Sequence, residues 1–300
     1  MLEHESTYLE DFDAERAWLR EPDLFPRFRI PDLGDPLADG KLDPDETLLV
    51  IEREGHRRAF RVKEMAYHHV AQGELAGQPY LLAFCVICHS GMGLDPRLEE
   101  EVHHFSAGGL YNGVVLLIDD ETRTYWDQIR GLAMHGPLRG ARMEAFPLEV
   151  TTVGAALREE ADLTLSRSRP KGFARLFGRM SRNPFRRRGF FPPGFRRTMG
   201  PKDERLPELA HGLGVMTDGA QRFYPLDRVV GDVEDELGGR PLRVSIDPET
   251  HVPSAIWLDT GTRTMQIFSR WYGFVAAYPK TDVYQALDER PRAVAVRRAL

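Results

Sequence analysis

The two cysteines of this 300-residue chain lie three residues apart and run directly into a histidine, in the sequence FCVICH (84–89). Two thiols at this spacing can chelate one soft metal ion, or they can form a reversible disulfide. They can also pack as small hydrophobic side chains without any chemical role. Candidate chemistry is therefore concentrated at Cys85 and Cys88, with metal binding, thiol redox chemistry and inert packing all open.

A metal site at this motif needs further ligands. His68 or His69, on the helix expected before the cysteine-bearing strand, can supply an imidazole, and His89 can supply another. Thiolate and imidazole together suit a transition metal such as zinc, copper(I) or iron, and three protein ligands would leave one position open. The predicted metal ligands are Cys85, Cys88, His68 and His89.

A redox role would require one thiolate with a lowered pKa, from a helix N-terminus or a neighbouring imidazolium. The sequence SGMGLD after the motif is a Gly-rich turn, which differs from the βαβ setting of thioredoxin-type sites. The run CVICH also matches the attachment motif of c-type haem, with Met92 as a conceivable axial ligand. Haem c is not expected, because its attachment normally requires export.

Composition bounds the class of protein. The chain is 42% hydrophobic and 29% charged, and no apolar run approaches the length of a membrane span. The N-terminal stretch is acidic and lacks the pattern of a signal peptide. Two cysteines form no disulfide framework. We expect a cytoplasmic protein, with peripheral contact to a membrane left open.

A basic segment interrupts an acidic chain. Residues 166–202 contain twelve Lys or Arg and no Asp or Glu, so the segment carries +12 and the remainder −18 for a net charge of −6. Apolar residues within 170–182 recur at the spacing of a basic amphipathic helix. The segment is predicted to contact an anionic membrane surface or an acidic protein face, with nucleic acid less favoured. The predicted contact residues are Arg175, Arg179, Arg186, Arg187 and Arg188.

The chain also repeats itself. Residues 55–82 and 219–244 each read as a Gly turn, an aromatic strand, a helical stretch and a second turn, ELAGQP or ELGGRP. The second copy lacks the thiols, since Asp247 stands opposite Cys85. The repeat predicts a strand-rich α+β fold with two pseudo-symmetric halves that arose by internal duplication. The predicted parts are an N-terminal extension (1–42), a first repeat with the CxxC site (43–165), a basic connector (166–205), a degenerate second repeat (206–285) and a tail (286–300).

Local patterns predict the elements. Strands are expected at 48–54, 57–62, 79–86, 114–120, 122–127 and 142–150, with a hairpin turn at 119–121. Short helices are expected at 63–72, 152–161, 226–236 and 272–278. His103, His104 and His135 are expected to be surface or hydrogen-bonded histidines.

The run LYNGVVLLIDDETRTYWDQIRGLAMHGPLRG (110–140) resembles the LYNSDLVMYDRETGSLWSQ…G…AGPLAG signature of the DUF3179 family, whose function is unassigned. The resemblance extends from about Asp43 to Tyr284 and includes DERLP (203–207). It implies that Tyr67-His68 and the CxxC match an aromatic–histidine pair and a CPLC-Gly strand end. Here the motif lacks the proline, and His89 replaces the glycine.

The signature residues Tyr111, Asn112, Trp126 and Gln128 are candidates for a pocket, and core or turn roles are equally open to them. Two functions remain in view. One is a metal-dependent or redox enzyme, or a metal carrier, that acts through the thiols. The other is a non-catalytic binding or scaffold module that acts through the basic connector.

Overall fold

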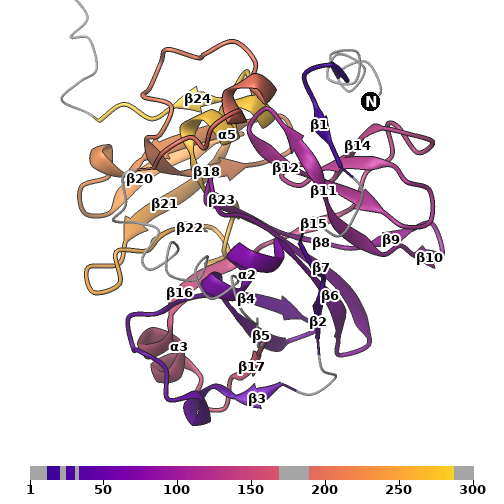
Figure 1. Cartoon of the computed structure of the whole chain (residues 1–300). Coiled ribbons are helices and arrows are strands. Elements are labelled where there is room, and N and C mark those ends of the chain that lie inside the picture. Colours follow the sequence, from indigo (N-terminus) through magenta and orange to yellow (C-terminus); the bar gives the residue numbers. More distant parts are fainter. Residues whose placement is uncertain (1–11, 21–24, 31–33, 169–188, 287–300) are drawn as a thin grey trace, which may run out of the picture.

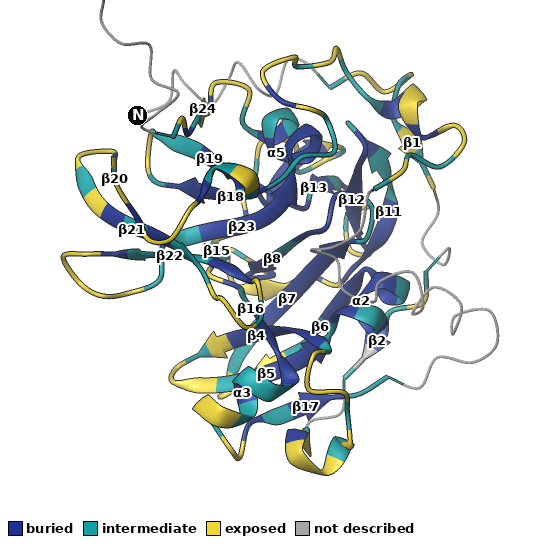
Figure 2. Cartoon of the chain, turned by 90° about the vertical axis from the view of Figure 1, so that its left-hand side faces the viewer, coloured by how far each residue is buried: buried dark blue, intermediate teal, exposed yellow. Residues whose placement is uncertain are grey.

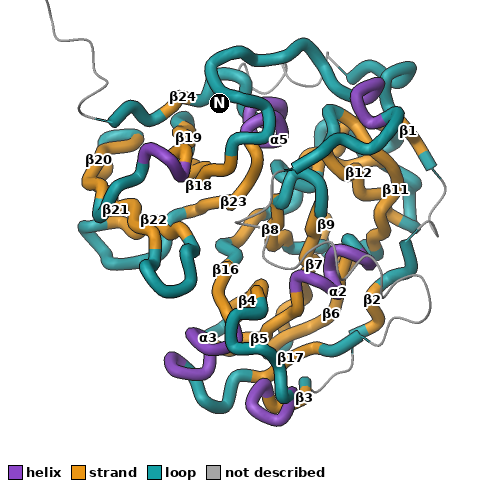
Figure 3. Tube along the Cα trace, turned by 60° about the vertical axis from the view of Figure 1, so that its left-hand side comes forward, coloured by secondary structure: helices purple, strands orange, loops and turns teal. Residues whose placement is uncertain are grey.

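The computed structural model describes residues 12–20, 25–30, 34–168 and 189–286 (Figure 1). The protein is mainly β, with 44% strand and 13% helix. In the described ranges, five sheets of three to five strands form a ring that resembles a five-bladed β-propeller. Figure 3 shows how few of the connections between strands are helical.

Each sheet is named here by one central strand. The β4 sheet has the order β16 (Glu149–Thr152), β4 (Thr47–Arg53), β5 (His56–Arg61), β17 (Thr164–Ser166) and β3 (Asp35–Pro36). The β7 sheet has the order β15 (Ala145–Phe146), β8 (Ser90–Leu94), β7 (Gln78–Cys85), β6 (Val70–Leu75) and β2 (Phe28–Arg29). The β12 sheet has the order β1 (Trp18–Leu19), β11 (Phe105–Tyr111), β12 (Val114–Asp119), β13 (Tyr125–Asp127) and β14 (Leu132–His135).

The C-terminal part adds two smaller sheets. The β18 sheet has the order β23 (Met265–Arg270), β18 (His211–Met216), β19 (Gln221–Pro225) and β24 (Asp282–Val283), and the β21 sheet has the order β20 (Val233–Leu237), β21 (Arg240–Ile246) and β22 (Pro253–Trp257). A short ribbon pairs β9 (Arg97–Leu98) with β10 (Glu101–Val102). The helices are α2 (Val62–His68), α3 (Val153–Glu159) and α5 (Trp271–Ala277), with 3-10 turns η1 (Leu37–Gly40), η3 (Phe195–Thr198) and η4 (Leu226–Arg228).

The α+β prediction with two pseudo-symmetric halves is wrong. Each of the three α-helices in the described ranges has only seven residues, too few to form a layer against the sheets. The helix expected at 226–236 is the turn η4 followed by strand β20. Exposure alternates along β20. Val233 and Leu237 are buried, Asp235 is half-buried, and the two glutamates between them are exposed, which is the period of a strand.

Two sheets nevertheless share one pairing pattern. In the β4 sheet, β16 and β5 flank β4 antiparallel, and β17 pairs parallel with β5. In the β18 sheet, β23 and β19 flank β18 in the same way, and β24 pairs parallel with β19. Four strands of the β12 sheet, β11 to β14, lie between β8 and β15 in the chain, and no sheet in the described residues takes the equivalent place after β22. The molecule therefore does not divide into two equivalent halves.

The largest hydrophobic core lies where the β7, β12 and β18 sheets meet. It includes the fully buried Trp126 and Trp271 and both cysteines. Figure 2 shows buried residues along β7, β12 and β23 around this region, while the outer loops are exposed. The thiol motif is therefore a part of the core.

Glu46 lies just before β4 and pairs with two positively charged side chains, Arg61 and Lys63. Its carboxylate accepts hydrogen bonds from Arg61 Nε at 2.6 Å and from Lys63 Nζ at 2.9 Å. Burial acts to raise the pKa of Glu46, but the bonds and charges of Arg61 and Lys63 outweigh it and lower the pKa. A lowered folded-state pKa means that this stabilisation is present above the unfolded pKa and is lost as the pH falls through the folded one.

We therefore expect Glu46→Gln to lower the free energy of unfolding by about 1–3 kcal/mol at pH 7. The difference from the original protein should shrink as the pH falls below about 4.5. Urea denaturation at several pH values measures both. Glu249→Gln is the control, because the Glu249–Arg158 pair is exposed and should contribute less than about 1 kcal/mol. If the two proteins still differed by the same free energy of unfolding at acid pH, this would contradict a lowered pKa of Glu46.

The basic helix predicted within 170–182 lies outside the described residues, as do the predicted contact residues Arg175, Arg179, Arg186, Arg187 and Arg188. Its membrane or protein contact stays a prediction. Within the described ranges, no helix has both the length and the apolar character needed to cross a membrane.

Candidate functional site

The CxxC motif lies in a tight hairpin between β7 and β8. Cys85 is the last residue of β7 and pairs with Ser90, the first residue of β8. Cys88 and His89 lie in the turn, where His89 has a positive φ of 54°. The turn itself contains no helix, but the first turn of α5 packs against it, since a Cβ at Gly273 would lie 3.0 Å from Cys88 Cβ.

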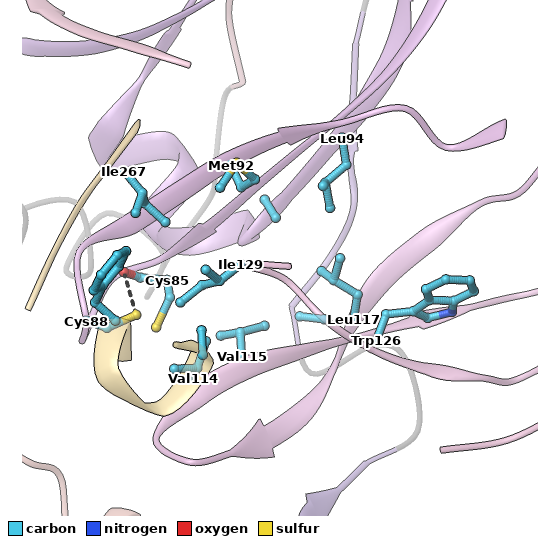
Figure 4. Close-up of a cluster of buried hydrophobic side chains, with 14 of the residues drawn as sticks. Cys85, Cys88, Met92, Leu94, Val114, Val115, Leu117, Trp126, Ile129 and Ile267 are labelled. Carbon is cyan, nitrogen blue, oxygen red and sulfur yellow. Dashed lines mark hydrogen bonds between the residues drawn. The ribbon is translucent and has the colours of Figure 1, made fainter. Parts of the chain in front are cut away.

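Both cysteines are free thiols inside the core. Cys85 is 1% exposed and Cys88 is 0% exposed. Figure 4 shows the two sulfur atoms facing the side chains of Val114 and Val115 from β12. A bulky protein partner has no direct access to sulfur atoms at this depth.

A line of polar atoms crosses the apolar core from the thiols. Ser90 Oγ lies 2.8 Å from Cys88 Sγ and accepts a hydrogen bond from Gln128 Nε2 at 2.9 Å. Gln128 is 1% exposed, and among the described residues its Oε1 has no hydrogen-bond partner. Burying polar atoms in this way is costly unless they are paired, and a remaining unpaired atom calls for an explanation such as a redox role or a bound water.

The two thiols differ in acidity. Burial acts to raise the pKa of Cys85, but hydrogen bonds from the Cys88 thiol and from backbone N–H groups, including that of Val115, lower the pKa to about 7. Burial raises the pKa of Cys88 well above its ordinary value, and the neighbouring Cys85 raises it further. Cys85 is therefore the more acidic of the two thiols.

Arg270 ties the β7–β8 turn to the C-terminal part of the chain. Its Nε donates to the carbonyl of Ile87 at 3.1 Å, and its Nη1 donates to the carbonyl of Leu209 at 2.9 Å. Its backbone N–H donates to the carbonyl of Cys88 at 2.8 Å. Arg270 is only 2% exposed, so its positive charge lies within the core beside the motif.

A cavity lies beside α5. It has a volume of about 420 Å³ and is lined by Tyr111, Asn112, Trp271 and Tyr272, among others. A much smaller cavity of about 10 Å³ shares Tyr111 and Asn112 and reaches Val115, whose N–H lies at Cys85. Tyr111 and Asn112 thus line both cavities, and neither cavity is lined by Cys85 or Cys88.

The sequence also matches a family profile. The profile is described as "Protein of unknown function (DUF3179)" and matches residues 22–288. The chain belongs to the DUF3179 family. No curated protein and no solved structure matches it.

In this DUF3179 protein, the other two signature residues proposed for the pocket lie in the core. Trp126 is 0% exposed, and its Nε1 donates to Asp119 Oδ2 at 2.8 Å. Gln128 belongs to the polar line that reaches Cys88 through Ser90. The signature of the DUF3179 protein thus contributes to both the pocket and the thiol site.

The structure does not gather the four predicted metal ligands. His68 Nδ1 lies 2.5 Å from the carbonyl of Pro26, and its Nε2 lies 2.6 Å from Ser168 Oγ, so both ring nitrogens have other partners. His89 Nδ1 faces His211 Nε2 at 3.2 Å. In the part of the chain described, neither histidine forms a ligand group of three with the cysteines.

Sequence reasoning missed Ser90 and Arg270. Ser90 stands two residues after Cys88, and a hydroxyl so close to a thiol was a usable signal. Arg270 precedes the apolar run WYGF, and an arginine there could have been flagged as a buried cation. Its contact with Ile87 spans 183 positions, which no local pattern reveals.

Proposed function

We propose that Cys85 and Cys88 form a buried redox centre that cycles between dithiol and disulfide. The observation that carries the proposal is the polar line from Cys88 through Ser90 to Gln128 inside an otherwise apolar core. Cysteines that served only as hydrophobic side chains would need no such partners. The unequal acidity of the two thiols fits an attacking Cys85 and a resolving Cys88.

The oxidant we propose is a low-molecular-weight disulfide. The Cys85 thiolate attacks one of its sulfur atoms, the disulfide bond breaks, and one thiolate leaves with the electron pair. The Cys88 thiol then gives its proton to the departing thiolate and attacks the Cys85 sulfur. The Cys85–Cys88 bond forms, the second half of the reagent leaves as a thiolate that takes a proton from water, and two electrons have moved from the protein to the reagent.

The pocket beside α5 supports access by a small reagent. Its volume of about 420 Å³ lies in the range of small-molecule sites. Tyr111 and Asn112 line both this pocket and the small cavity at Val115, which has room for only about one water, so a reagent would reach Cys85 only after the side chains between them move. Arg16, Arg130 and Lys202 line the pocket together with Asp203 and Glu208, so its wall carries one more positive than negative side chain.

A thiolate metal site is the second candidate. Without histidine ligands the pair offers two sulfur ligands, and soft thiolates in this number suit copper(I) rather than a four-coordinate zinc ion. The close Cys85–Cys88 contact favours this candidate as well, because both thiols would face one ion. Metal content therefore has to be measured together with thiol state.

Thiol counting tests the proposal sharply, because the chain has only two cysteines. Protein purified without oxygen is equilibrated in oxidised or reduced glutathione and quenched with acid. It is then unfolded and alkylated, and its mass is measured by mass spectrometry. We expect two alkyl groups after reduction and none after oxidation. Cys88→Ala should instead retain one glutathione on Cys85, because the resolving thiol is gone.

Two results would overturn the redox assignment. One is the recovery of both thiols after full equilibration with the oxidant. The other is about one equivalent of metal in the purified protein that disappears in the Cys85→Ser/Cys88→Ser variant, which would establish the metal site instead.

A further inference from the structure

A second group of possible ligands lies about the β12–β13 turn. Asp119 is the last residue of β12, Glu121 lies in the turn, and His103 precedes β11. One ligand atom from each lies within 4.8 Å of the other two. We propose that His103, Asp119 and Glu121 bind a divalent transition-metal ion such as Zn²⁺ or Mn²⁺.

The distances are close to those of a metal site. His103 Nδ1 lies 3.5 Å from Asp119 Oδ1 and 3.8 Å from Glu121 Oε2. Ligand atoms about 2.1 Å from a tetrahedral ion are themselves separated by about 3.4 Å. The Asp119 and Glu121 ligand atoms lie within 4.8 Å of each other, so the partly exposed Glu121 side chain would have to move toward Asp119 for all three atoms to share one ion.

The burial and hydrogen bonding of His103 support the site independently of these distances. It is only 6% exposed, yet among the described residues its Nδ1 has no hydrogen-bond partner. The loop around it is fixed, because Gln72 Nε2 donates to the His103 carbonyl at 2.6 Å and Gln72 Oε1 accepts from Phe105 N at 2.9 Å. A buried imidazole nitrogen that is fixed in place and aimed at two carboxylates is suited to metal binding.

The two carboxylates are held in place as well. Asp119 Oδ2 accepts from Trp126 Nε1 at 2.8 Å and from Thr124 N at 3.1 Å, and its Oδ1 accepts from Thr122 N at 2.6 Å. The Thr122 N–H and the Thr122 hydroxyl both donate to Oδ1, so a metal ion bound there would displace the hydroxyl, which also lies 2.7 Å from Thr124 Oγ1. Such hydrogen-bonded carboxylates are pre-oriented ligands.

The turn also leaves room for solvent ligands. The Glu121 side chain is 33% exposed. Its Oε1 lies 2.7 Å from His104 Nδ1, and its Oε2 accepts a hydrogen bond from His104 N at 2.9 Å and lies 3.8 Å from His103 Nδ1. One imidazole and two carboxylates suit the manganese-to-zinc series, whereas calcium prefers oxygen ligands only. Bound water would complete the coordination on the exposed side.

The test uses the full chain with Cys85→Ser/Cys88→Ser, so that the thiols cannot bind the metal. After removal of metal with a chelator, calorimetric titration with Zn²⁺ and, separately, Mn²⁺ is expected to show one site. His103→Gln and Glu121→Gln should each weaken binding at least tenfold. Glu101→Gln is the matched control, because this exposed carboxylate belongs to the β9–β10 ribbon, and it should leave the affinity unchanged.

Histidine nitrogen chemical shifts provide a second readout that does not depend on heat of binding. Zn²⁺ should shift the Nδ1 resonance of His103. Failure of both ions to bind at millimolar concentration would overturn the proposal and leave His103 as an ordinary partner of the carboxylates. Binding that is equally strong in His103→Gln and Glu121→Gln would overturn it too.

Discussion

Replacing Arg270 by methionine is expected to lower the free energy of unfolding by about 2–4 kcal/mol. The substitution keeps a long apolar side chain but leaves the carbonyls of Ile87 and Leu209 without this charged donor inside the core. Removing the buried charge recovers part of the loss, since burial disfavours the guanidinium and lowers its pKa. Chemical denaturation of the two proteins measures the difference.

Arg205→Met is the matched control. Arg205 also donates to two carbonyls, of Thr281 at 2.6 Å and Pro279 at 3.1 Å, but its side chain is 41% exposed. Water can replace its hydrogen bonds, so we expect a loss of less than about 1 kcal/mol. Equal losses in the two variants would show that Arg270 does not stabilise the core in the way described.

Removing Cys88 is expected to make Cys85 a weaker acid. The Cys88 thiol donates the hydrogen bond that contributes most to lowering the pKa of Cys85 to about 7. In Cys88→Ala that pKa should rise, and the thiolate fraction at pH 7 should fall about tenfold. The ultraviolet absorbance of the thiolate, followed against pH, reports this directly because no third cysteine is present.

Two further variants serve as comparisons for the titration of Cys85 in Cys88→Ala. Cys85→Ala should lower the pKa of Cys88, because the neighbouring thiolate no longer raises it. Ser90→Ala removes a partner of Cys88 and none of the hydrogen bonds that lower the pKa of Cys85, so the Cys85 titration should move much less. An unchanged curve in Cys88→Ala would contradict the hydrogen bond between the thiols.

Local patterns predicted most of the strands around the site. The β-branched and aliphatic run at 114–120 forms β12 (Val114–Asp119), and the turn expected at 119–121 connects it to β13. The helix expected at 226–236 failed because tertiary pairing with β21 selects an extended strand there. The stretch VEDEL has so few apolar residues that periods of 2 and 3.6 both fit it.

The site was predicted only in part, because several of its contacts join residues that are far apart in the sequence. The CxxC spacing located the thiols, because that signal is contained within four residues. The partner Gln128 lies 38 positions from Ser90, and it reaches the thiols only because β12 and β13 pack against β7 and β8. His68 is near the motif in sequence, yet its ring stacks on Phe28 in a different hydrophobic cluster.

An equilibrium redox titration tests the thiol centre most directly. The full chain is equilibrated at a series of potentials, and the fraction of protein with alkylatable thiols is measured at each. We predict one two-electron transition that involves both Cys85 and Cys88, with a midpoint between about −300 and −120 mV. Thiols that remain reduced at every potential, or a transition that consumes only one of them, would contradict a dithiol–disulfide centre in this protein.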